Sequence, residues 1–147
     1  RTDVNYSPSD VFETFPRPQL TDELEQIGRT LSGDRQEIMV RRNLGLTQLY
    51  NLINDTQVLA DKDITRMRDI HAKLDRAVLD AYGWSDIDPA HGFHTYRQME
   101  RWTICPSCRI EIFDRLLAEN IRRASTEKPS SKASRKVKVG DAAMLFD

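Results

Sequence analysis

An amphipathic stripe between residues 62 and 82 constrains the fold more than any other feature of the sequence. Apolar residues recur there at steps of three and four, which fits the 3.6-residue period of an α-helix. Asp61 stands at the position of an N-cap, and Gly83 stands where a left-handed residue commonly ends a helix. We therefore predict a helix over about 62–82 with one buried face. The stripe consists of Ile64, Met67, Ile70, Leu74, Val78 and Ala81 or Tyr82.

Two further helices are predicted before this stripe. Thr21 resembles an N-cap and is followed by acidic residues, which the positive end of a helix dipole stabilises. The apolar positions that follow predict one helix over about 22–42, with a break allowed at Ser32-Gly33. After a joint at residues 43–45, a shorter apolar helix is predicted over 46–53.

The other segments have different patterns. Residues 1–19 contain three prolines, which remove backbone donors, and they predict an irregular arm. Residues 84–104 are rich in aromatic side chains and predict a loop with one short strand near 97–104. Pro106 is suited to open a last helix. Its predicted apolar face consists of Ile110, Phe113, Leu117 and Ile121.

The predicted fold class is mainly α, with three to four helices and one short β or loop segment. Residues 20–124 form the helical domain, after the irregular arm over 1–19. Residues 125–147 hold five Lys/Arg and three acids, lack apolar periodicity, and predict a disordered basic tail. A chain of 147 residues is long enough for one such domain.

Charge and composition exclude several classes of protein. The chain has 22 Lys+Arg and 23 Asp+Glu, so it is not a globally basic nucleic-acid binder. No apolar run approaches the ~20 residues of a membrane helix, so no membrane partner is expected. Two cysteines in a polar chain favour the reducing cytoplasm. Because the sequence opens at Arg1 without an initiator Met, we expect a piece of a longer chain.

Two close pairs of potential zinc ligands lie on either side of the aromatic segment. His91 and His94 precede Cys105 and Cys108, and such pairs can supply a tetrahedral zinc site. The alternatives are a packed aromatic turn at the histidines and, for the cysteines, a redox pair or ordinary residues at a helix start. The packed, metal-free alternative is preferred, so no metal is expected.

No motif of an active site is present in the sequence. It contains neither a dinucleotide-binding nor a P-loop glycine pattern, nor a nucleophile elbow. His71 lies beside the apolar stripe and is interpreted as a helix histidine rather than a base. We therefore expect this segment to catalyse nothing alone and to need no cofactor.

Contact with DNA is a better functional hypothesis, because phosphate binding needs Lys and Arg but no fixed motif. Arginines near Tyr96 and Trp102 could also stack on a displaced base. The candidate DNA contacts are Arg41, Arg42, Arg97, Arg101, Lys132, Arg135, Lys136 and Lys138.

Four phrases of the sequence, taken in order, support a family resemblance. They are Tyr6-Ser7-Pro8-Ser9-Asp10-Val11-Phe12-Glu13-Thr14-Phe15-Pro16, Arg42-Asn43-Leu44-Gly45-Leu46-Thr47 with Tyr50-Asn51, Leu79-Asp80-Ala81-Tyr82-Gly83-Trp84 with His91-Gly92-Phe93-His94, and Thr103-Ile104 before 111–120. Together they resemble the C-terminal region of large adenine-N6 DNA methyltransferases of type IIG and related phage-defence restriction-modification systems. The resemblance spans residues 6–121.

This resemblance implies a parent enzyme that uses S-adenosylmethionine and methylates a flipped adenine. The present segment would then be non-catalytic, pack on the methyltransferase core and assist DNA target binding. The expected core-docking residues are Phe12, Phe15, Ile64, Met67 and Leu74. The alternatives are a helical protein-interaction module without a DNA role, and a small zinc-stabilised domain.

Overall fold

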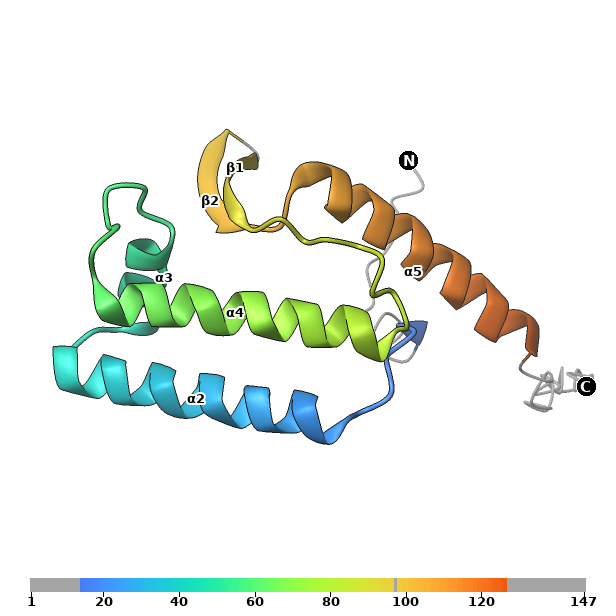
Figure 1. Cartoon of the computed structure of the whole chain (residues 1–147), viewed down its shortest axis with the longest axis horizontal. Helices are drawn as coiled ribbons and strands as arrows, with labels where there is room; N and C mark the ends of the chain where they lie inside the picture. The colour runs from blue at the N-terminus through green and yellow to red at the C-terminus, as the bar shows by residue number, and fades with distance from the viewer. Residues whose placement is uncertain (1–13, 97, 127–147) are drawn as a thin grey trace, which may run out of the picture.

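The computed structural model describes residues 14–96 and 98–126. Helix α2 (Asp22–Arg42) and helix α4 (Lys62–Ala81) lie side by side, and the short helix α3 (Leu46–Ile53) packs at one end of α4 (Figure 1). Strands β1 (Gly92–Tyr96) and β2 (Met99–Thr103) form a hairpin, which is followed by helix α5 (Pro106–Thr126). The mainly α fold class is confirmed.

Local capping sets the bounds of the two long helices. The Thr21 hydroxyl accepts a hydrogen bond from the Leu24 amide, and Asp61 accepts from the first-turn amides of α4. Helix α2 runs without a break through residues 32–33 and ends at Asn43, which adopts a left-handed φ of 50°. Gly83 follows α4 with φ 76°, as predicted from its position.

The core lies where α2, α3 and α4 meet. Ile64 and Met67 of the amphipathic stripe are fully buried against side chains from the other two helices. This corrects the prediction that these two residues dock on a separate methyltransferase core, because they have no surface left for a partner. The buried core cluster consists of Ile38, Leu49, Ile53, Ile64 and Met67.

The aromatic segment contains two strands rather than the predicted single strand near 97–104. β1 and β2 pair antiparallel, with Phe93 opposite Trp102. The two rings meet edge to face, with centroids 5.4 Å apart. The backbone amide of Trp102 donates to the Asn54 side chain, so the hairpin is fixed to the end of α3.

Helix α5 begins at Pro106 as predicted, but its apolar face is exposed. The predicted face is 51–65% accessible at its four large side chains. Two other apolar residues of the helix, Ile112 and Leu116, are partly buried. Its polar contacts with the rest of the chain include a two-bond ion pair between Arg115 and Asp86 and a bond from Arg123 to the Arg17 carbonyl. Across the described ranges, no helix is both long enough and apolar enough to span a membrane.

Candidate nucleic-acid interface

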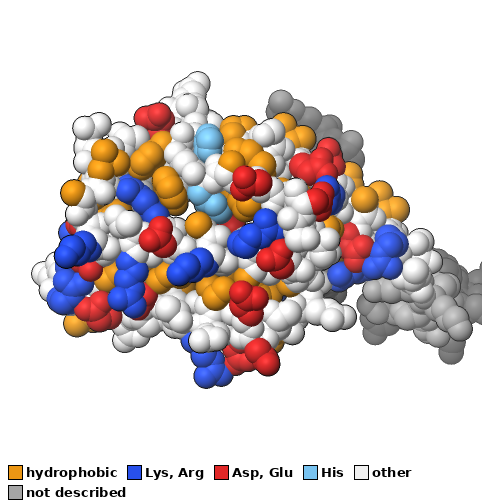
Figure 2. Space-filling model, viewed as in Figure 1, with side chains coloured by type: hydrophobic (Ala, Val, Ile, Leu, Met, Phe, Trp, Pro, Cys, Tyr) orange, Lys and Arg blue, Asp and Glu red, His pale blue; other side chains and the backbone are white. Residues whose placement is uncertain are grey.

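A cavity of about 440 Å³ lies between the hairpin and the helices α3, α4 and α5. Figure 2 shows histidine side chains beside a hollow above α4, with hydrophobic and basic side chains around it. Its volume falls within the ~300–1,000 Å³ typical of sites for small organic ligands. The side chains that matter for its chemistry are Tyr50, His71, Asp75, His91, Tyr96, Arg101, Trp102 and Arg109.

Two hydrogen-bonded pairs supply polar groups to this cavity. The Tyr50 hydroxyl lies 3.1 Å from His71 Nε2, and His91 Nε2 lies 2.8 Å from Asp75 Oδ2. His71 and Asp75 are one turn apart on α4, which places them on the same face. Burial lowers the pKa of the His71 imidazole below its ordinary value, an effect that the nearby Asp75 carboxylate opposes. His71 is therefore neutral at neutral pH and has one donor and one acceptor nitrogen.

Two arginines bring positive charge to the same cavity. The guanidinium of Arg109, in the first turn of α5, lies 4.5 Å from the ring centroid of Tyr96. Arg101, on β2, is exposed. Neither has an acidic partner among residues 14–96 and 98–126, whereas an arginine such as Arg115 is paired with two acids. Both arginines line the cavity together with Tyr96 and Trp102, and DNA contact by Arg101 stays a prediction.

Arg68 supports the aromatic wall of the cavity from within the fold. It is only 6% exposed, and its guanidinium lies 4.9 Å from the ring centroid of Phe93 and 5.5 Å from that of Trp102. Burial lowers the pKa of Arg68. Sequence reasoning missed this residue, although its position four residues after Ile64 places it on the apolar side of α4.

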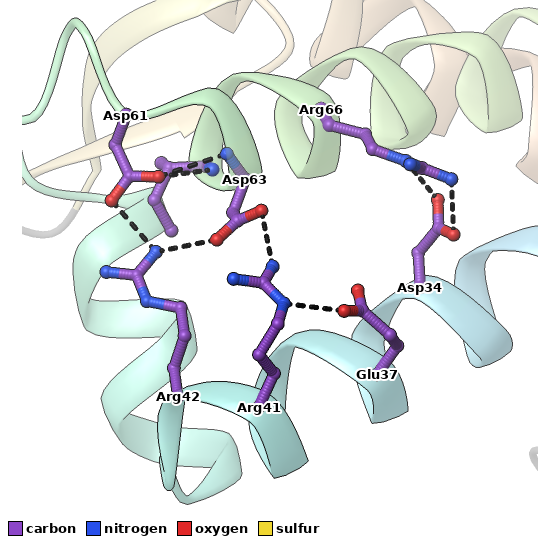
Figure 3. A network of polar contacts seen from close by, with 8 residues as sticks. Asp34, Glu37, Arg41, Arg42, Asp61, Asp63 and Arg66 are labelled. Atoms are coloured by element: carbon purple, nitrogen blue, oxygen red, sulfur yellow. Dashed lines mark hydrogen bonds and ion pairs between the residues drawn. The ribbon is translucent and has the colours of Figure 1, made fainter.

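Arg41 and Arg42, two predicted DNA contacts, are engaged in ion pairs (Figure 3). Arg42 donates to Asp61 and Asp63, and Arg41 donates to Asp63 and Glu37. Burial acts to raise the pKa of Asp61, but hydrogen bonds from Arg42 and from backbone amides outweigh it and leave that pKa lowered. These charges join the end of α2 to the start of α4, and phosphate contact by either arginine stays a prediction.

Two other predicted site residues, Phe15 and Leu74, do not line the cavity. Phe15 is exposed, and Leu74 is partly buried on α4. Phe12, Arg97 and the tail residues Lys132, Arg135, Lys136 and Lys138 lie outside the described residues.

The four potential zinc ligands make other contacts. Cys105 and Cys108 form a disulfide at the start of α5. His91 binds Asp75, and His94 Nε2 lies 3.2 Å from the Ala90 carbonyl oxygen. Within the described residues, no group of three or more His, Cys, Asp or Glu is arranged to hold a metal ion.

The cavity is the best candidate site because it combines two arginines that have no ion pair within the described residues, aromatic rings, a neutral imidazole and the Asp75 carboxylate. Such groups suit phosphate and base contacts. Comparison with protein-family models, with curated proteins and with solved structures finds no match to this chain.

Proposed function

We propose that this chain is a non-catalytic C-terminal segment of a DNA adenine methyltransferase or restriction-modification protein. It assists DNA target binding and packs on the methyltransferase core, which carries the S-adenosylmethionine chemistry. The observation that carries the DNA role is the pair Arg101 and Arg109, both without an acidic partner in the described part of the chain and both beside the aromatic cavity. A guanidinium binds a phosphate through parallel, charge-assisted hydrogen bonds.

The exposed face of α5 supports the packing role. Four large apolar side chains lie along it, and all are at least half exposed. A contiguous apolar patch on a protein surface commonly marks an interaction site. The same face favours a second candidate function, a helical protein-interaction module that has no DNA role.

DNA binding separates the two candidates. We would measure fluorescence anisotropy of a labelled duplex at about 50 mM and about 200 mM salt, because each phosphate contact releases counterions and steepens the salt dependence. The doubly substituted variant Arg101→Gln/Arg109→Gln should weaken binding about tenfold and reduce the salt slope by about 1–2.

The matched control is Arg29→Gln/Arg122→Gln, which removes the same charge from exposed, ion-paired arginines on α2 and α5. It should change the affinity by less than about twofold. Absence of duplex binding at low salt, or equal losses in both variants, would refute the DNA role and leave the interaction module.

A further inference from the structure

We infer that the cavity binds an unpaired nucleotide of a DNA strand, an inference that rests on the proposed DNA role. The chemistry required is a phosphate together with a planar base that is free of its partner strand. A paired base lies inside the stack and could not reach into a cavity of this kind, whereas an unpaired base presents its faces and its edge.

Charge is distributed in the cavity as a nucleotide requires. The positive groups come from β2 and α5, at Arg101 and Arg109, while the carboxylate of Asp75 comes from α4. A phosphate would bind at the arginines, and the base would lie toward the neutral and acidic groups of α4. An anion alone would leave those groups without a ligand.

The hydrogen-bonding groups near α4 match the edge of a base. Asp75 uses one carboxylate oxygen for His91, and its other oxygen, Oδ1, accepts no hydrogen bond from a described residue. His71 uses Nε2 for Tyr50, and its other ring nitrogen has no hydrogen bond within the described residues. An acceptor and a neutral imidazole side by side can bind the amino and ring-nitrogen groups of a base.

Aromatic rings supply the third requirement. Tyr96 lies at the end of β1, is 39% exposed, and lines the cavity next to Arg109. Stacking of an unpaired base on such a ring is sequence-tolerant, because every base has a π-face. The site should therefore prefer unpaired DNA over duplex without a strict sequence requirement.

The test compares three labelled DNAs by anisotropy: a duplex, the same duplex with a short single-stranded gap, and the single strand. The gapped and single-stranded DNAs should bind about tenfold more tightly than the duplex. Tyr96→Leu should abolish this preference, whereas the control Phe113→Leu, at another exposed aromatic residue away from the cavity, should retain it.

A second measurement needs no variant. The chain has three histidines, so their imidazole proton resonances report on the site in a simple NMR spectrum. Deoxyadenosine monophosphate should shift the His71 and His91 signals, and inorganic phosphate should leave His71 unshifted. Equal shifts with both probes would show an anion site only and overturn the inference.

The two proposals fail differently. Equal affinity for duplex and gapped DNA, unchanged by Tyr96→Leu, would overturn the unpaired-nucleotide site and leave the DNA role standing. Absence of binding to all three DNAs would overturn both the proposed function and the unpaired-nucleotide site.

Discussion

Replacing Arg68 with methionine should destabilise the fold strongly, although the residue is charged and lies on a helix. Its guanidinium donates to the Ile53 carbonyl oxygen through two nitrogens, at 2.9 and 2.8 Å, in a buried setting. It also donates to the carbonyls of Val58, Asp55 and Leu52. Three of these four carbonyls lie at or just after the end of α3, where helix carbonyls lack intrahelical partners.

The magnitude follows from which carbonyls water can reach. The bonds to Val58, Asp55 and Leu52 are partly buried, so water can replace Arg68 there. The Ile53 bonds are buried, and an unsatisfied acceptor costs about 1–3 kcal/mol. Loss of the cation–π contacts with the hairpin rings adds about 1 kcal/mol. We expect a total of about 2–4 kcal/mol, or a Tm about 10 °C lower for a chain of this length.

Chemical denaturation followed by circular dichroism measures this loss. The matched control is Arg66→Met on the same helix, which removes an exposed arginine that pairs with Asp34. That surface pair should contribute at most about 1 kcal/mol. If Arg68→Met were no more destabilising than Arg66→Met, the stabilising role assigned to the buried carbonyl bonds would be wrong.

Three further outcomes test other parts of the fold. Because the pKa of His71 is lowered in the folded state, the unfolded chain binds a proton at this residue more tightly, and the free energy of unfolding should fall as the pH drops below about 6.5. His71→Gln should flatten this pH dependence in urea titrations, and an unchanged dependence would contradict the prediction. Gly83→Ala should lower the free energy of unfolding by about 1–2 kcal/mol, because residue 83 has a positive φ. Gly28→Ala within α2 should raise it by about 0.5–1 kcal/mol, as measured by thermal unfolding. Destabilisation by both substitutions would refute the argument. Phe113→Gln with Leu117→Gln should change the unfolding free energy by less than about 1 kcal/mol in urea titrations, because both side chains are at least half exposed. A larger loss would mean that this face is packed within the chain.

The long helices could be predicted because their signals are local. Thr21 and Asp61 each cap amides within three residues, and the stripe on α4 depends only on sequence spacing. Strand β1 could not be predicted in the same way, because Gly92–Tyr96 lacks a clear polar–apolar alternation. Its conformation depends on pairing with β2, and the hydrogen bond from the Trp102 amide to the Asn54 side chain fixes that pair in place.

The candidate site was predictable only where it is continuous in sequence. Arg101 lies beside Trp102 along the chain, so their proximity needed no fold. His71 and Arg109 come from α4 and α5, and only tertiary packing brings them to the same cavity. Arg42 shows a different limit of the sequence. It was predicted to contact DNA as an unpaired basic residue, but in the fold it forms ion pairs with two acids that are 19 and 21 residues away.

The cavity also has a thermodynamic consequence, because its walls come from parts of the chain between residues 50 and 109. A ligand that contacts α3, α4, the hairpin and α5 together binds the folded chain and has no comparable site in the unfolded one. Its binding free energy is therefore added to the free energy of unfolding, by about 2.7 kcal/mol at a hundredfold excess over Kd. Helix α5, which contains no fully buried residue, should gain the most from this non-covalent cross-link, since the cavity includes Arg109 from its first turn.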